Sequence, residues 1–302
     1  MASKITGTGV ALVTPFDAKG RRVDYAALTK LVNFVADNGV NFLVALGTTA
    51  ETPTLSTGEK KEVLSCIKSS NTKKLPIALG IGGNNTANVL ERIQQTDFNG
   101  IDALLSVTPY YNKPSQQGLY EHFKAIAAAS PVPLLLYNVP ARTGVNLSAE
   151  TTLRLAREVK NIMGIKEASG NLSQISHILR DKPEDFVALS GDDALTLPLM
   201  AVGAHGVISV AANAFPKQVV DMVKLAGAQK YSEAAKIHLA MTPLVDALFA
   251  EGNPVGVKAA LSVQGIIGNV LRLPLVSATE GLVSSIAALI KQLDDLKNEN
   301  LN

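Results

Sequence analysis

Short apolar segments recur along the chain at fairly even intervals. Each has the length of a strand and is nearly continuous in apolar character, without the alternation of a strand that is exposed on one face. Parallel strands that are covered on both faces have this pattern. We therefore predict eight buried parallel strands, at residues 9–14, 42–46, 76–80, 103–107, 133–137, 162–166, 186–190 and 206–210.

Amphipathic helical patterns lie between these segments. Leu28, Leu31, Val32 and Val35 recur at the spacing of one helix face, and Asp24 precedes them as a candidate N-cap. The pattern predicts a helix that starts after Asp24, ends near residue 39 and buries this apolar face against the strands.

Helix-start signals recur further along the chain. Ser56 with Glu59, and Asn171 with Gln174, have the spacing of a capping box, in which each residue caps the backbone of the other. Pro216 stands where a first helical turn accepts proline, because an N–H there would have no intrahelical partner. These signals predict that helices alternate with the strands.

The alternation favours a (β/α)8 TIM barrel. A doubly wound sheet is the alternative, but it needs a glycine-rich phosphate turn after an early strand. Residues 80–85 lack the third glycine at the required spacing, and no well-placed acidic residue follows, so we expect an ordinary loop. Beyond the last strand, residues 229–251, 254–264 and 277–297 have helical patterns. We predict a barrel over residues 1–227 and a C-terminal helical domain over residues 228–302.

The composition narrows the function classes. The chain has 302 residues, 47% of them apolar and 18% charged, with a formal net charge of +2 and no dense lysine or arginine tract. We therefore expect no nucleic-acid partner. The single cysteine, Cys66, excludes an intrachain disulfide framework. Residues 8–15 fit a first strand better than a secretion signal, and no apolar run is long enough to span a bilayer, so we expect a cytosolic protein.

Lys166 stands at the end of the sixth predicted strand. A lysine inside a buried sheet has to leave water, which is costly unless its charge is paired or lost. An amine that loses its proton there can attack a ketone. The simpler alternative is a structural ion pair, for example with Glu167, and Lys166 alone does not decide between the two.

Other reactive side chains follow the neighbouring strands, where the active site of such a barrel lies. Tyr137 could move protons during imine formation, and Thr48 could pass them on. The backbone after Gly47 could bind a carboxylate, and Arg142 could hold a second one. Each has a structural alternative: a buried tyrosine that only needs a partner, a common turn, and a surface ion pair.

Metal chemistry has little support in the sequence. Asp192 and Asp193 fit a helix N-terminus better than a metal site. The histidines show no metal-ligand spacing; they are His122, His177, His205 and His238. We predict no metal site.

Together the motifs at the strand ends resemble those of dihydrodipicolinate synthases, within the pyruvate-dependent class I aldolase family that also contains N-acetylneuraminate lyase. The resemblance runs over essentially the whole chain. The matching segments are Gly-Thr-Thr-Ala-Glu-Thr at 47–52, Thr-Pro-Tyr-Tyr-Asn at 108–112, Tyr-Asn-Val-Pro-Ala-Arg-Thr-Gly at 137–144 and Gly-Ile-Lys-Glu-Ala at 164–168.

The resemblance implies a lyase of diaminopimelate and lysine biosynthesis. Pyruvate would form an imine with Lys166, and the resulting enamine would attack L-aspartate-4-semialdehyde before the product cyclises and leaves. The residue matching Tyr137 would shuttle protons through that matching Thr48, and the residue matching Tyr111 would complete this relay across a subunit interface. The family also implies a homotetramer built as a dimer of dimers, with no metal or organic cofactor.

The resemblance further implies substrate-binding residues. Thr49 matches a residue that helps bind the pyruvate carboxylate, and Arg142 matches the one that receives the carboxylate of the semialdehyde. Gly191 and Ile208 match positions that line the pyruvate pocket. A related aldolase acting on a sugar acid or another 2-keto acid, and a catalytically inactive binding barrel, are the alternatives.

Two departures from the family pattern stand out. Ala50 replaces a glycine, which would be strained at positive φ, and we expect the loop to tolerate it. Members that lysine inhibits generally carry histidines where this chain has Thr57 and Lys60, and a glutamate where it has Asn88. We therefore predict weak or absent feedback inhibition by L-lysine.

Overall fold

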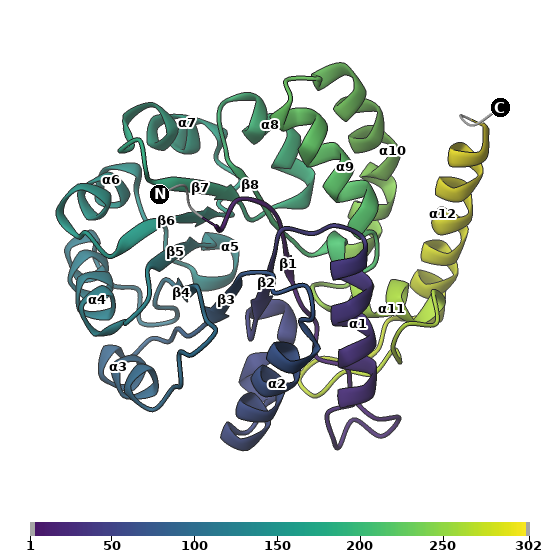
Figure 1. Ribbon diagram of the computed structural model, residues 1–302, viewed down its shortest axis with the longest axis horizontal. Coiled ribbons are helices and arrows are strands. Elements are labelled where there is room, and N and C mark those ends of the chain that lie inside the picture. The colour runs from purple at the N-terminus through teal and green to yellow at the C-terminus, as the bar shows by residue number, and fades with distance from the viewer. Residues whose placement is uncertain (1–3, 300–302) are drawn as a thin grey trace.

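The structure is a computed structural model that describes residues 4–299. Its centre is a closed barrel of eight parallel strands in chain order (Figure 1). This confirms the predicted TIM barrel and excludes the doubly wound sheet. The strands are β1 (Gly7–Ala11), β2 (Phe42–Ala45), β3 (Ile77–Gly80), β4 (Ala103–Val107), β5 (Leu134–Asn138), β6 (Ile162–Glu167), β7 (Val187–Ser190) and β8 (Gly206–Ser209).

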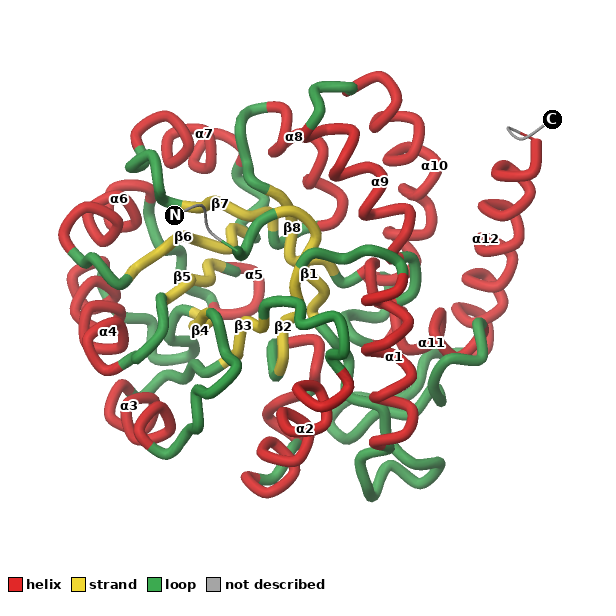
Figure 2. The backbone as a smooth tube through the Cα atoms, in the orientation of Figure 1, coloured by secondary structure: helices red, strands yellow, loops and turns green. Residues whose placement is uncertain are grey.

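Helices surround the barrel as an outer layer (Figure 2). Those between the strands are α1 (Tyr25–Asp37), α2 (Thr57–Ser70), α3 (Thr86–Gln94), α4 (Gln116–Ala129), α6 (Ala149–Glu158), α7 (Leu172–Asp181) and α8 (Thr196–Ala201), and α9 (Pro216–Gly227) follows β8. Short helices follow several strands: η1 (Thr48–Ala50), η2 (Thr52–Thr54), α5 (Pro140–Thr143), η3 (Asp193–Leu195) and η4 (Ala211–Asn213).

Local sequence signals begin the helices as expected. The side chain of Asp24 accepts a hydrogen bond from the N–H of Ala27, 2.9 Å away, and caps α1. Ser56 and Glu59 form a complete capping box at the start of α2, and Pro216 is the first residue of α9. Each contact satisfies or avoids a backbone N–H that a helix end leaves free.

The second predicted capping box forms only in part. Asn171 accepts a hydrogen bond from the N–H of Gln174, but the Gln174 side chain does not return to Asn171. It donates instead to Glu167 Oε2 at 3.2 Å and to Asn146 Oδ1 at 3.2 Å. The prediction is wrong here because a contact with the outer face of the barrel replaces the local one.

The first strand ends earlier than its apolar run predicts. Strand β1 ends at Ala11, and residues that follow it form hydrogen bonds with other loops. The Val13 N–H donates to the Asn213 side chain at 3.1 Å, and the Thr14 hydroxyl donates to the Ala50 carbonyl at 2.8 Å. The apolar run therefore continues into a buried loop that links the ends of β1, β2 and β8.

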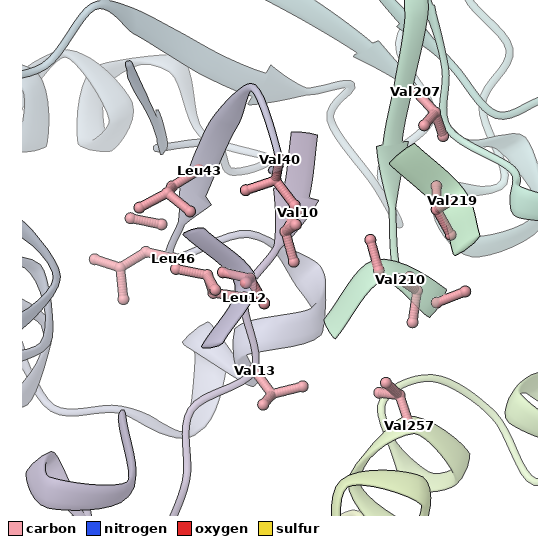
Figure 3. Close-up of a cluster of buried hydrophobic side chains, with 14 of the residues drawn as sticks. Val10, Leu12, Val13, Val40, Leu43, Leu46, Val207, Val210, Val219 and Val257 are labelled. Carbon is pink, nitrogen blue, oxygen red and sulfur yellow. The ribbon is translucent and has the colours of Figure 1, made fainter. Parts of the chain in front are cut away.

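Alternate residues of the strands form two buried clusters, as the pleat of a β-strand requires. In β2, Val44 packs inside the barrel with Leu135 and Ile208, whereas Leu43 belongs to the cluster between strands and helices. Figure 3 shows part of this outer cluster, which includes Leu43 and, at the lower right of the view, Val257 of the C-terminal region.

Three helices follow the barrel, as predicted: α10 (Tyr231–Phe249), α11 (Val255–Val263) and α12 (Glu280–Glu299). Helix α10 packs against α9, α11 and α12, and α12 stands at the edge of the molecule (Figure 1). The division at residues 227 and 228 stays a prediction, and its outer bounds, residues 1 and 302, lie outside the described residues. No helix between residues 4 and 299 is long and apolar enough to cross a membrane.

Candidate active site

A cavity of about 600 Å³ opens at the carboxyl ends of the strands. Residues of β1 to β6, of the loops after β2, β3, β4 and β5, of α2 and α3, and of the C-terminal region form its walls. Four of the predicted site residues line it together: Thr48, Tyr137, Arg142 and Lys166. The position agrees with the general location of active sites in (β/α)8 barrels.

Lys166 is a buried lysine that faces this cavity. Its side chain is 5% exposed, and its Nζ lies 4.2 Å from the centre of the Tyr137 ring on the adjacent strand. The two residues are direct neighbours in the β5–β6 register. Within residues 4–299, no carboxylate lies within ion-pair distance of Lys166, and its Nζ makes no hydrogen bond.

Glu167 does not pair with Lys166, because successive residues of a strand point to opposite faces. Its carboxylate lies outside the barrel, where it accepts hydrogen bonds from the Asn138 amide, the Ser169 N–H and the Gln174 amide. Burial raises the pKa of Glu167, and these hydrogen bonds oppose the shift. The alternative in which Lys166 is merely ion-paired with Glu167 is therefore wrong.

Gly191 packs directly against the lysine side chain. A Cβ at this position would lie 2.9 Å from Lys166 Cε and 2.8 Å from the Cβ of Ala168. Neither distance is possible without displacement, so only glycine leaves Lys166 in its present position. Gly191 therefore packs against the side chain of Lys166, but it does not itself line the cavity.

The loop after β2 is built from two short helical turns. Thr48 begins the first turn and lines the cavity, whereas Thr49 is buried behind it. Ala50 is not among the described residues with positive φ, so the expected tolerance of alanine is confirmed. The left-handed position is Glu51 instead, with φ of 53°.

Glu51 is held in this unfavourable conformation by a buried ion pair. Its carboxylate lies 2.5 Å from Nζ of Lys258, and neither side chain is exposed. Lys258 also donates to the carbonyl of Val270 at 2.9 Å, and the Arg272 N–H donates to Glu51 at 3.0 Å. Burial lowers the pKa of the Lys258 ammonium, and the Glu51 carboxylate opposes that shift.

The C-terminal region also reaches the cavity through Asn253. Its amide donates a hydrogen bond to Thr49 Oγ1 at 3.0 Å, and its carbonyl lies 3.5 Å from a guanidinium nitrogen of Arg142. Asn253 lines the cavity itself. Sequence analysis missed Asn253 and Lys258, because no local pattern reveals contacts between residues that lie about two hundred positions apart.

Like Thr49 and Gly191, the predicted site residues Tyr111 and Ile208 do not line the cavity. Tyr111 projects from the loop after β4 with 89% of its side chain exposed and a φ of 73°, whereas its neighbour Tyr110 lines the cavity. Ile208 is buried in the interior cluster that also contains Tyr137. Within one chain, therefore, Tyr111 is separated from the other candidates.

The carboxylates of Asp192 and Asp193 both accept hydrogen bonds from backbone N–H groups. Asp192 caps η3, and the buried Asp193 accepts hydrogen bonds from the Ser209 hydroxyl and the Val210 N–H at the end of β8. Burial raises the pKa of Asp193, and these hydrogen bonds lower it. Across the described part of the chain, no group of three or more histidine, cysteine or acidic residues could hold a metal ion.

Fold and site together define a (β/α)8 barrel with a lysine-bearing cavity at the carboxyl ends of its strands. The model of the Dihydrodipicolinate synthetase family matches residues 4–293. The chain is 52% identical to the 4-hydroxy-tetrahydrodipicolinate synthase of Parabacteroides distasonis, over 96% of this chain and 97% of that protein. It is 50% identical to that of Flavobacterium psychrophilum, over 95% of this chain and 98% of that protein.

Solved structures agree with these relatives. The crystal structure of dihydrodipicolinate synthase from Thermotoga maritima matches with a TM-score of 0.93 and 40% identity, over 96% of this chain and 98% of that chain. The chain belongs to the dihydrodipicolinate synthetase family. The resemblance inferred from four strand-end motifs is thereby confirmed.

Proposed function

We propose that the protein is a 4-hydroxy-tetrahydrodipicolinate synthase, a lyase that condenses pyruvate with L-aspartate-4-semialdehyde. The observation that carries the proposal is the lysine itself. Lys166 is buried, faces a cavity and has no counter-charge among residues 4–299. The names of the relatives, which match over nearly the full length, support the same activity. They give no support to an aldolase for sugar acids.

The chemistry starts at Lys166 Nζ. Its neutral amine attacks the ketone carbon of pyruvate, water leaves, and an imine forms. Loss of a methyl proton gives an enamine, whose carbon attacks the aldehyde of the semialdehyde and forms the new carbon–carbon bond. Cyclisation then releases the product and frees the lysine. The imine itself withdraws electrons from the methyl group, so the proposed reaction requires no metal or organic cofactor.

Tyr137 is the proposed proton carrier of imine formation. Its ring lies against Lys166, and its hydroxyl makes no hydrogen bond to another described side chain or backbone group. The phenol is therefore free to exchange a proton with the carbinolamine oxygen that must leave as water. Thr48 lines the same cavity and would pass the proton onward.

The last residue of this proton relay would come from a neighbouring subunit. Tyr111 is highly exposed and reaches no residue of its own cavity, which suits a side chain that completes the site of a second copy. This proposal requires an oligomer, and the family expectation is a homotetramer built as a dimer of dimers. We also propose a cytosolic location, as expected for an enzyme of amino-acid biosynthesis.

The substrate carboxylates have separate proposed partners. The backbone around Thr49, in the turn after β2, would bind the carboxylate of pyruvate, while Gly191, which packs against Lys166, and Ile208, which is buried with Tyr137, would shape the pyruvate pocket from behind these side chains. Arg142 lines the outer part of the cavity and would receive the carboxylate of the semialdehyde. An arginine fork suits a carboxylate, because both groups are planar and form two parallel hydrogen bonds.

A turnover assay tests the proposal most simply. The purified protein is given pyruvate with aspartate semialdehyde, and in a parallel reaction pyruvate with a sugar aldehyde. The proposal predicts product only with the semialdehyde, and no product with Lys166→Ala. Activity with the sugar aldehyde alone would assign the protein to another aldolase reaction.

A further inference from the structure

The outer face of the barrel carries a buried polar contact directly behind Lys166 and Tyr137. Strands β5 and β6 lie side by side (Figure 1), with Tyr137 opposite Lys166 and, one position further, Asn138 opposite Glu167. Because successive residues of a strand point to opposite faces, the first pair faces the cavity and the second pair lies outside the barrel. The Asn138 amide donates to both carboxylate oxygens of Glu167 at 3.2 Å, and both side chains are buried. This contact joins the two strands at the last position of their ladder.

Further hydrogen bonds hold both members of the contact in place. The Glu167 carboxylate also accepts from the Ser169 N–H at 2.8 Å and from the Gln174 amide at 3.2 Å. The side-chain oxygen of Asn138 accepts from the Leu147 N–H at 2.9 Å. Neither side chain can turn away without breaking several of these bonds, so the contact fixes one strand end relative to the other.

The contact buries a carboxylate without a cation. Within residues 4–299, no lysine, arginine or histidine lies within ion-pair distance of Glu167. Such a charge is costly to bury even when its oxygens are hydrogen-bonded, and a well-packed apolar side chain would often be the more stable choice. An apolar side chain could not, however, direct hydrogen bonds across the strands. The advantage of Glu167 is therefore the alignment that it imposes.

The alignment of β5 and β6 needs such a constraint. The register shifts between Leu134 and Leu135, so that one residue of β6, Met163, has no partner in β5. An extra residue of this kind bends a strand, and a slip by one position turns every later side chain to the opposite face. Such a slip would remove Lys166 from the cavity.

We propose that Glu167 and Asn138 are positioning residues that hold the Tyr137 phenol in place beside Lys166 Nζ. The inference rests on the proposed function, in which this phenol carries a proton during imine formation. The distance of 4.2 Å between Lys166 Nζ and the centre of the Tyr137 ring depends on how the two strand ends are aligned, and the contact fixes that alignment one residue further along. Without the contact the reacting groups remain but are misplaced, and a misplacement of about 1 Å can lower a rate by about 10²-fold.

Rapid-quench trapping of the pyruvate imine with borohydride, at saturating pyruvate, tests this inference. Glu167→Gln keeps the side-chain shape but turns an amide N–H toward hydrogen-bond donors, so it should slow imine formation about tenfold. In a Tyr137→Phe background the same substitution should slow it less than twofold, because no phenol remains to be misplaced. Asn138→Ala removes the other half of the contact and should show the same pattern, so the test does not depend on a single variant.

Asn161→Ala is the matched control. Asn161 lies just before β6, at the end away from the cavity, and its amide donates to the carbonyls of Ala127, Ser130 and Val132. The substitution removes a comparable set of hydrogen bonds from the same strand. It should lower the melting temperature but change the rate of imine trapping by less than twofold, with or without the Tyr137 hydroxyl.

Three results would overturn the inference while the proposed function stands. Equal slowing by Glu167→Gln with and without the Tyr137 hydroxyl would show that the carboxylate acts independently of the phenol. Wild-type trapping rates in both Glu167→Gln and Asn138→Ala would show that the contact has no role in the reaction. Tenfold slowing by Asn161→Ala would trace the effect to a general loss of stability. If the wild type forms no trapped imine, the proposed function fails, and this inference fails with it.

Discussion

Two of the lysines whose side chains the structure describes are buried, Lys166 and Lys258, and they differ in their partners and in their access to a cavity. Lys258 has no exposed surface, and it lies against Glu51, the Val270 carbonyl and the Phe16 ring, 4.2 Å from its centre. Lys166 is almost as buried, yet it faces a cavity and has no ion pair among residues 4–299.

The comparison shows that burial alone does not make a lysine reactive. A buried ammonium with a carboxylate and a carbonyl beside it keeps its charge and holds structure together. A buried lysine with no counter-charge can act as a nucleophile where a substrate can reach it. Of these two lysines, Lys166 has that access and Lys258 does not, and the cavity at Lys166 also presents Tyr137 and Thr48.

The largest expected effect is the loss of turnover in Lys166→Met. Removing a covalent nucleophile should lower kcat by about 10⁴-fold or more. The fold should persist, because the substitution breaks no ion pair and approximately keeps the side-chain volume. The measurements are steady-state turnover and a thermal unfolding curve. Retention of a tenth of the activity would contradict the role given to Lys166.

The next effect concerns stability. Lys258→Met leaves the Glu51 carboxylate buried without its partner, which should cost about 3–5 kcal/mol of unfolding free energy. Urea unfolding of Lys258→Met, Glu51→Gln and the double variant measures the coupling between the two groups. The double variant should be more stable than Lys258→Met alone, because it no longer buries a lone carboxylate. A double variant as unstable as the sum of both changes would show that the pair has no net coupling.

Tyr137→Phe should reduce kcat by roughly 10²–10³-fold, in the range of general acid–base contributions. The ring that packs against Lys166 is preserved, so only the proton carrier is lost. Single-turnover experiments should show slow imine formation with unchanged protein stability. Tyr137→Phe with wild-type rates would remove the phenol from the mechanism.

The smallest expected effect is that of L-lysine. An ammonium group near Lys60 and Arg92 is repelled rather than bound, so millimolar L-lysine should change the rate by less than about twofold. Initial rates at fixed pyruvate, with and without L-lysine, provide the measurement. Strong inhibition below millimolar concentration would show that the charges at Lys60 and Arg92 do not set the effector response.

Much of this architecture was predictable from short segments of the chain. Continuous apolar runs predict buried parallel strands, and their regular alternation with helices predicts the barrel. In such a barrel the strands end on one face, which brings Lys166, Tyr137, Thr48 and Arg142 together. These steps need only local patterns and one rule about where strand ends meet. The same local reasoning identified the caps at Asp24 and Ser56.

What remained hidden depends on distant contacts. Nothing near Asn253 or Lys258 in the sequence indicates that they hold the loop after β2, because their partners, Thr49 and Glu51, lie about two hundred positions earlier in the chain. Similarly, Gln174 has the spacing of a capping residue, but contacts Glu167 because the outer face of β6 offers a buried acceptor. The contacts that such side chains make therefore depend on tertiary structure, which a local sequence pattern does not reveal.

Borohydride reduction in the presence of pyruvate tests the difference between the two buried lysines most directly. The reductant converts an imine into a stable secondary amine, which peptide mass spectrometry can locate. The account predicts one pyruvate-derived adduct per chain, on Lys166, and an unmodified Lys258. An adduct at another lysine, or none in an active preparation, would contradict the claim that an uncharged amine at Lys166 performs the chemistry.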